Sequence, residues 1–174
     1  MKKILYIDMD NVLVDFQSGI DRYKRADDFT KAMLGWDKHY DDDFKPMDWE
    51  GKWDECPFLF GIMQPMPGAV ESFHRLSTMF DTYILSTAPW LNPTAWMHKR
   101  EWVQNYLGEA AHKRLILTHH KHLNKGHYLI DDRTANGADR FEGTLVQFGT
   151  PGLENWEKVM ERMEMEYELS EATK

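Results

Sequence analysis

Two carboxylates, Asp8 and Asp10, follow a short apolar run near the start of the chain. Residues two apart on an extended strand point to the same side, so both carboxylates can face one site. Such oxygen ligands suit a hard cation, and the pair therefore predicts a Mg²⁺ site. An EF-hand calcium loop is excluded, because Val12 stands where that loop needs an oxygen ligand and its glycine and terminal glutamate are missing. The structural alternative is a solvated strand end.

Later apolar runs also end in polar groups, which are Ser86 and Thr87, then Lys121, then Asp131 and Asp132. The carboxyl ends of parallel strands meet at one edge of a sheet, where ligands of such sheets bind. We therefore expect all these groups to converge on the first acid pair. Lys125 is the alternative lysine, but it lies too close to the next apolar run.

Together these groups could hydrolyse a phosphate monoester. Acids from the first and last motifs would hold Mg²⁺, which bridges to a phosphate oxygen. Asp8 would attack phosphorus, and Asp10 would protonate the departing alcohol and later deprotonate water to hydrolyse the phosphoaspartate. Ser86 would donate a hydrogen bond to a phosphoryl oxygen, and Lys121 would neutralise the charge on the nucleophile and on the transferring group.

The elements that must position these groups alternate between strands and helices. Short apolar runs predict five strands, at residues 3–9, 82–87, 114–118, 127–131 and 144–148. Apolar residues at helical spacing predict helices at residues 69–80, 94–107 and 154–168. In the second of these helices, the stem of Lys99 lies on the apolar face. This order predicts an α/β fold with a Rossmann-like parallel sheet and helices on both faces.

One stretch after the first strand does not fit this alternation. It has no clear strand, and aromatic residues lie in it among many acids, namely Trp36, Phe44, Trp49, Trp53, Phe58 and Phe60. Pro65, Pro67 and Gly68 then suit a return to the sheet. We expect a small helical cap at residues 17–65, inserted in a core domain of residues 1–16 and 66–174. The alternative is that the aromatics only fill the main core.

The composition fits one soluble domain of 174 residues, of which 42% are apolar and 29% charged. A formal net charge of −8 argues against a nucleic-acid polymer as partner, since basic faces hold phosphate backbones. The sequence has no long apolar run and no signal-peptide pattern, so we expect no membrane span and no secretion. Cys56 is the only cysteine, which excludes an intrachain disulfide and indicates a reducing, cytoplasmic compartment.

Two other groups of reactive side chains have simpler interpretations. The histidines at positions 119, 120, 122 and 127 could form a transition-metal site, but no predicted helix aligns them, which favours a polar loop around Lys121. Cys56 has no cation near it in sequence, so we expect a half-buried thiol and not a nucleophile.

The motifs resemble those of the haloacid dehalogenase (HAD) superfamily of aspartate-nucleophile phosphatases, and within it the 5'(3')-deoxyribonucleotidase family. Residues 8–16 (DMDNVLVDF) are similar to its opening motif, although Asn11 replaces the usual glycine, and asparagine tolerates left-handed turns. Residues 86–87 match its hydroxyl motif, although Ala88 precedes the proline. Lys121 has the spacing of the family lysine, and residues 129–133 (LIDDR) are similar to its last acidic motif. Residues 53–60 and 65–70 resemble its cap and re-entry.

The resemblance implies a role for each motif. It makes Asp8 the nucleophile and Asp10 the acid/base, with Mg²⁺ held by Asp8, the Asp10 carbonyl and the second acid pair. Asp132 is the preferred direct ligand, with Asp131 as the alternative.

The resemblance also implies the residues that bind substrate. Phe16 and Trp53 would face the nucleobase, or serve only in packing, and Thr87 would help to place the nucleotide. Arg133 could bind phosphate or pair with the local acids.

We expect a magnesium-dependent phosphatase whose partner is a small-molecule phosphate monoester, with (deoxy)ribonucleoside monophosphates as the favoured substrates. The alternatives are the same chemistry on a sugar phosphate or another metabolite, since caps choose the substrate, and a non-catalytic binding protein. The preferences for 5' or 3' phosphate, sugar and base stay open, as does the formation of a homodimer.

Overall fold

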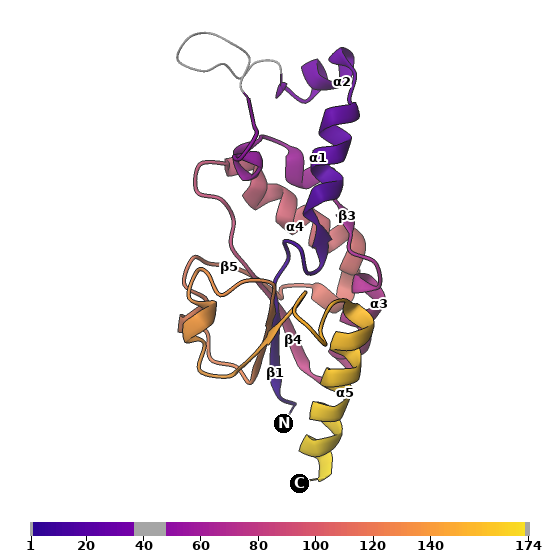
Figure 1. The fold of residues 1–174 in the computed structure, drawn as a ribbon, viewed down its shortest axis with the longest axis vertical. Helices are drawn as coiled ribbons and strands as arrows, with labels where there is room; N and C mark the ends of the chain where they lie inside the picture. The colour runs from indigo at the N-terminus through magenta and orange to yellow at the C-terminus, as the bar shows by residue number, and fades with distance from the viewer. Residues whose placement is uncertain (1, 37–47, 173–174) are drawn as a thin grey trace.

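A parallel sheet of five strands lies at the centre of the protein, in the order β5-β4-β1-β6-β7 (Figure 1). The computed structural model describes residues 2–36 and 48–172, so that residues 37–47 of the expected cap, with Phe44, lie outside the described part. The strands are β1 (Ile4–Ile7), β4 (Asp81–Ser86), β5 (Leu115–Leu117), β6 (Tyr128–Asp131) and β7 (Thr144–Gln147). All five expected strands are confirmed.

The strand order reverses at β1. This strand pairs with β4 on one side and with β6 on the other, so the chain runs outward from β1 in both directions. In open α/β sheets this reversal leaves a crevice at the carboxyl ends of the central strands. Asp8 follows β1 directly and therefore stands at the crevice.

Side chains alternate between the two faces of the sheet, as the pleat of a strand requires. On β1, Leu5 and Ile7 join the larger core cluster, whereas Tyr6 joins a smaller cluster on the opposite face. The larger cluster is covered by three helices, α3 (Ala69–Met79), α4 (Pro93–Leu107) and α5 (Trp156–Ala172). These helices are the three expected from the sequence.

The expectation of helices on both faces was wrong. The smaller cluster is covered by Ala138 and Phe141, which lie in and beside the short 3₁₀ turn η6 (Ala138–Arg140). The connections after β5 and β6 are short and polar, and they form only the turns η5 (Lys121–Leu123) and η6. These connections cover residues 118–127 and 132–143, at most the dozen residues that a helical crossover needs, and their turns take up part of that length.

The segment between β1 and α3 leaves the sheet at the carboxyl ends of the strands, at the end of the molecule opposite both termini (Figure 1). A short antiparallel ribbon of β2 (Val14–Asp15) and β3 (Gln64–Pro65) forms its base. Its described helices and turns are α1 (Phe16–Arg25), α2 (Asp28–Met33), η2 (Trp53–Glu55) and η3 (Leu59–Gly61). This is the helical insert expected after the first strand, and its boundaries as a separate domain stay a prediction.

The insert packs directly on the core beneath it. Its buried aromatics Trp36, Trp49 and Phe60 belong to the same cluster as the sheet residues Leu5 and Ile7. These three aromatic residues of the insert therefore pack in the main core, whereas Trp53 lines the cavity described below. In the part of the chain that the structure describes, no helix is both long enough and apolar enough to cross a membrane.

Candidate active site

The first acid motif turns sharply at the end of β1. The Asp8 amide donates to the Ile130 carbonyl at 2.9 Å, and the amides of Leu13 and Val14 both donate to the Met9 carbonyl, at 2.9 and 2.8 Å. Asn11 has a φ of 58°, in the left-handed region that asparagine tolerates better than most residues. The turn thus accommodates Asn11 where a glycine was expected from the resemblance.

Lys121 lies between two buried carboxylates. Its ammonium is 3.0 Å from Asp8 Oδ1 and donates a short hydrogen bond to Asp131 Oδ2, and all three side chains are at most 3% exposed. The backbone amide of Lys121 donates to the Asn136 carbonyl, which orders the turn. Lys125 is exposed and does not take this position.

Burial and charge shift the titration of these groups. Burial raises the pKa of Asp131 to about 6, and the negative charge of Asp8 adds to the shift, whereas Lys121 opposes it. Burial lowers the pKa of Lys121, but the charges of Asp8 and Asp131 raise it by more, so that the net shift is upward. An ammonium thus stays charged beside the expected nucleophile.

Three carboxylates are close enough to share a cation. Asp8, Asp131 and Asp132 each offer one oxygen, and these oxygens lie within 4.8 Å of one another. Asp132 Oδ1 is buried and has no hydrogen-bond partner among the described residues, although Arg133 Nε lies 3.7 Å from it. The Arg133 side chain is largely exposed and makes no hydrogen bond to this oxygen, so it compensates the buried carboxylate only weakly. The three carboxylates therefore still fit a divalent ion with oxygen ligands.

A second buried lysine, Lys99 on α4, joins the site, and the sequence analysis did not assign it. Its ammonium donates to Asp10 Oδ1 at 2.7 Å and to Ser86 Oγ at 3.1 Å, and the residue is 1% exposed. Burial raises the pKa of Asp10, and Lys99 opposes this shift. The signal in the sequence was a lysine on the apolar face of a predicted helix.

These groups surround one cavity of about 670 Å³ between the sheet and the insert. Seven of the predicted site residues line it: Asp8, Asp10, Phe16, Trp53, Thr87, Lys121 and Arg133. Ser86, Asp131 and Asp132 do not line it. Ser86 is fully buried, and Asp132 accepts a hydrogen bond from the Asn11 side chain at 3.3 Å.

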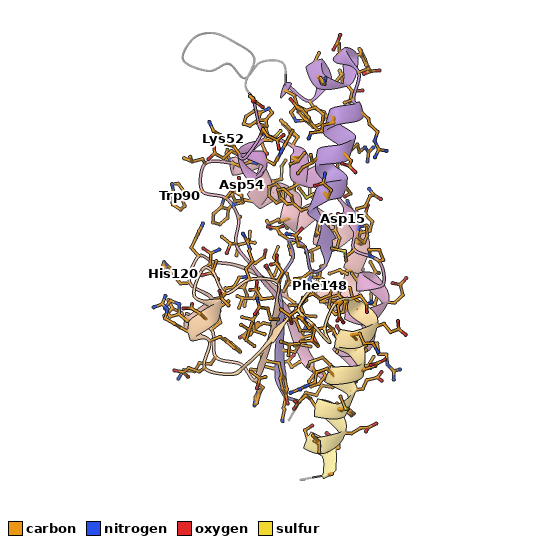
Figure 2. The ribbon with its side chains drawn as sticks, in the orientation of Figure 1. Asp15, Lys52, Asp54, Trp90, His120 and Phe148 are labelled. Carbon is orange, nitrogen blue, oxygen red and sulfur yellow. The ribbon has the colours of Figure 1, made fainter. Side chains whose placement is uncertain are left out.

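Aromatic side chains form the walls of the cavity. Phe16 contacts Phe60 edge to face at 5.7 Å between ring centroids, and the Trp53 ring lies beneath the Lys24 ammonium at 5.3 Å. On the other wall, Trp90 follows β4 and is 78% exposed, which the sequence analysis did not predict. Figure 2 shows Trp90 standing out from the ribbon on the same side as Lys52 and Asp54 of the insert.

A family model described as "5' nucleotidase, deoxy (Pyrimidine), cytosolic type C protein" matches residues 2–165. The chain belongs to this nucleotidase family. The match includes every residue of the candidate site, from Asp8 to Arg133, and agrees with the resemblance seen in the motifs.

Curated relatives extend the comparison. A candidate 5'(3')-deoxyribonucleotidase of Vibrio phage KVP40 is 53% identical over 159 residues, which cover 91% of this chain and 83% of that protein. The 5'(3')-deoxyribonucleotidase of Bacillus subtilis is 28% identical over 94% of this chain and 99% of its own length. The human cytosolic 5'(3')-deoxyribonucleotidase is 28% identical over 73% of this chain and 69% of its own length.

Solved structures share the fold of this nucleotidase-family chain. A HAD-hydrolase candidate from Bacillus subtilis, YfnB, solved with bound magnesium, has a TM-score of 0.57 at 15% identity and covers 92% of this chain and 97% of that chain. The L-2-haloacid dehalogenase of Xanthobacter autotrophicus has a TM-score of 0.51 at 16% identity, over 86% of this chain and 78% of that chain. At such identities the likeness concerns the fold alone, and that fold is the HAD fold.

The remaining reactive side chains of this family member do not add to the site chemistry. Within the described ranges, the acid cluster is the one group that could hold a metal, and the histidines near Lys121 do not gather into another. Cys56 is fully buried, not half-buried as expected, and burial raises the pKa of its thiol to about 12. A thiol in this state is a poor nucleophile.

Proposed function

We propose that this chain is a magnesium-dependent phosphatase that hydrolyses (deoxy)ribonucleoside monophosphates through a phosphoaspartate intermediate. The observation that carries the proposal is the position of Asp8, which lines the cavity, faces the Lys121 ammonium at 3.0 Å and shares an acid cluster with Asp131 and Asp132. Family membership and the names of the relatives support the same reaction.

The reaction has two steps. A carboxylate oxygen of Asp8 attacks phosphorus, the bond between phosphorus and the ester oxygen breaks, and Asp10 gives its proton to the leaving alcohol. Water then attacks phosphorus of the phosphoaspartate, Asp10 takes up a proton from that water, and the bond between phosphorus and the Asp8 oxygen breaks. This releases inorganic phosphate and restores the Asp8 carboxylate. The raised pKa of Asp10 suits the first step, since the carboxyl must carry a proton before it can donate one.

Cations of the chain stabilise the charge that moves during these steps. Lys121 would neutralise Asp8 and a phosphoryl oxygen. Arg133 lines the cavity, is mostly exposed and has its Nε 3.7 Å from Asp132 Oδ1, and it would also meet the incoming phosphate. Ser86, as predicted, would donate to a phosphoryl oxygen.

Asp8, the Asp10 carbonyl and the second acid pair would hold Mg²⁺, which supplies charge neutralisation on the phosphate and polarises its oxygens. We assign the direct contact in the second pair to Asp132. Its Oδ1 has no hydrogen-bond partner among the described residues, whereas Asp131 is engaged by Lys121 and by the Arg133 amide.

The walls of the cavity suit a nucleoside. Phe16 and Trp53 would contact the base, since aromatic rings stack on any base, and Thr87 at the cavity wall would help to place the sugar phosphate. We propose a deoxyribonucleoside monophosphate because the relatives are named 5'(3')-deoxyribonucleotidases. The single cysteine of the sequence supports action in the cytoplasm, since proteins of oxidising compartments often carry disulfides.

The test measures release of inorganic phosphate by the purified chain with Mg²⁺ from dUMP, dTMP and a set of sugar phosphates. We expect turnover of the nucleotides at higher kcat/KM than any sugar phosphate, and near-complete loss in Asp8→Asn. Equal turnover of sugar phosphates would overturn the substrate assignment. Unchanged hydrolysis in Asp8→Asn would overturn the mechanism.

A further inference from the structure

Lys99 is the buried charge that the two-step mechanism above does not use. Its Nζ lies between a carboxylate and a hydroxyl of the site, 2.7 Å from Asp10 Oδ1 and 3.1 Å from Ser86 Oγ. The residue is 1% exposed and is not among those that line the cavity. Lys99 therefore contacts Asp10 and Ser86, which are expected to act on the substrate, but does not itself line the cavity.

The contact with Ser86 sets the direction of the serine hydroxyl. A hydroxyl has one hydrogen to donate and two lone pairs that accept. An ammonium has only hydrogens, so Lys99 must be the donor and Ser86 Oγ the acceptor. The hydroxyl hydrogen of Ser86 is thereby kept for another acceptor, and a phosphoryl oxygen is such an acceptor.

The contact with Asp10 selects between its two carboxylate oxygens. Lys99 engages Oδ1 in a close ion pair, which leaves Oδ2 to exchange a proton with the leaving alcohol or with water. Proton transfer requires the donor to lie within hydrogen-bond reach of the reacting oxygen, so the rotation of this carboxyl matters for both steps.

The insert holds Lys99 in turn. The Lys99 Nζ lies 4.9 Å from the centroid of the Phe60 ring, and Phe60 belongs to η3 and is buried. The face of an aromatic ring attracts a cation, and this attraction is stronger when the pair is shielded from water. One side chain thus connects the insert, helix α4, the strand end at Ser86 and the first acid motif.

We propose that Lys99 is a positioning residue: it orients Asp10 for proton transfer and Ser86 for phosphate binding, and Phe60 keeps it in place. The inference rests on the proposed phosphatase function. It adds that Lys99, through its contact with Phe60 of the insert, fixes the position of the Asp10 carboxyl relative to the insert.

The test compares two substrates in Lys99→Met, which keeps most of the side-chain volume and removes the ammonium. The alcohol of dUMP needs a proton as it leaves, whereas the phenolate of p-nitrophenyl phosphate does not. Because general acid catalysis contributes about 10²–10⁴-fold, we expect kcat/KM for dUMP to fall by about 10²-fold, and by at least about 10-fold more than kcat/KM for p-nitrophenyl phosphate.

The second step gives an independent readout. Water attack on the phosphoaspartate still needs Asp10 as base, so kcat falls for both substrates in Lys99→Met. We expect a pre-steady-state burst of p-nitrophenolate that approaches about one equivalent per active site, because the covalent intermediate accumulates. A merely structural role for Lys99 would lower both kcat/KM values equally and produce no such burst.

Arg100→Met is the matched control. Arg100 is the next residue of α4 and is exposed, so this substitution removes a cation from the same helix without changing the site. We expect its kinetics to be those of the wild type. If Lys99→Met fails to fold, as judged by circular dichroism, Lys99→Gln and Phe60→Leu carry the same comparison. In each of them the loss for dUMP must exceed the loss for p-nitrophenyl phosphate.

Equal losses for the two substrates, or no loss, in the folded variants would overturn the role of Lys99. Failure of the wild type to hydrolyse either substrate would instead overturn the proposed function. If the wild type hydrolyses p-nitrophenyl phosphate and a sugar phosphate but not dUMP, only the substrate assignment fails, and the sugar phosphate replaces dUMP in the comparison.

Discussion

At the scale of single residues, the site consists of buried charged side chains, each in contact with a side chain of opposite charge. Lys121 pairs with Asp8 and Asp131, and Lys99 pairs with Asp10. A buried ion pair contributes little net stability, but removing one partner leaves an uncompensated charge. The arrangement therefore serves orientation and charge placement more than the stability of the fold.

Asn11 provides a prediction about the proposed metal site. Its side-chain amide donates to Asp132 Oδ2 at 3.3 Å, and its φ of 58° suits glycine equally well. Partners of this kind orient metal ligands, and their loss lowers metal affinity by about 10–100-fold. We expect Asn11→Gly to bind Mg²⁺ about 10-fold more weakly, measured by isothermal titration calorimetry without substrate.

Lys113→Gly is the control for this change, because Lys113 is an exposed residue with a φ of 59°, away from the acid cluster. It should bind Mg²⁺ as the wild type does. Unchanged affinity in Asn11→Gly would show that Asp132 needs no support from the amide.

Asp131 makes stability depend on pH in the metal-free protein. Its pKa is raised to about 6 in the folded chain, above the ordinary value of 3.8. The folded state therefore holds this proton more tightly than the unfolded state, and the stabilisation is present below pH 3.8 and is lost as pH rises through about 6. At 1.36 kcal/mol per pKa unit, the loss is about 3 kcal/mol.

Urea unfolding in EDTA between pH 4 and pH 7 measures this loss. We expect Asp131→Asn to be less sensitive to pH than the wild type across this window, because its amide does not titrate. Identical pH profiles for the two proteins would contradict the raised pKa. Asp139→Asn is the control, since Asp139 is exposed and should leave the profile unchanged.

At the scale of elements, the start of α4 ties the insert to the sheet. Asn92, 1% exposed, caps the helix by accepting from the Ala95 amide at 3.2 Å. Its amide group also donates to the carbonyls of Asp54 and Cys56, both at 2.9 Å. The same side chain thus fixes the helix that carries Lys99 and the turn that carries Trp53.

Asn92→Ala should be strongly destabilising for this reason. The lost cap costs about 1–2 kcal/mol and the unsatisfied insert carbonyls about 1–3 kcal/mol more. Urea unfolding measures the sum. Asn92→Ser keeps a capping oxygen but loses the amide donors, so its destabilisation should be smaller than that of Asn92→Ala. Equal effects of the two substitutions would contradict the capping role, and a negligible effect of Asn92→Ser would contradict the role of the amide donors.

At the scale of the whole molecule, the two faces of the sheet are covered unequally. Three long helices lie over the larger cluster, whereas Ala138 and Phe141 close the smaller one. Phe141 contacts the Tyr6 ring edge to face at 6.0 Å and is 8% exposed. The stability of this face depends on very few side chains.

Phe141→Ala should therefore cost about 3–5 kcal/mol, the usual range for removing a buried phenylalanine. The free energy of unfolding in urea measures it. Phe29→Ala is the matched control, because Phe29 is 74% exposed and its loss should change stability little. Similar values for the two variants would mean that the smaller cluster is not a second core.

The sequence by itself determined the elements and the motifs. Period-two and helical patterns are local, so they identified the five strands, the three long helices and the acid and hydroxyl groups at strand ends. The spacing of Lys121 from Asp131 is also local, and the two side chains meet. The sequence therefore favours Lys121 over Lys125 as the lysine of the site.

Only the tertiary structure decided which distant groups touch. The contacts of Lys99 with Asp10 and Ser86 depend on how α4 crosses the end of the sheet, which no periodicity encodes. Tertiary packing also decided which face of the sheet the helices cover. It likewise decided that Trp90 lines the cavity. These features follow from packing between segments far apart in the chain, whose free energy is a property of the assembled core and not of any one segment.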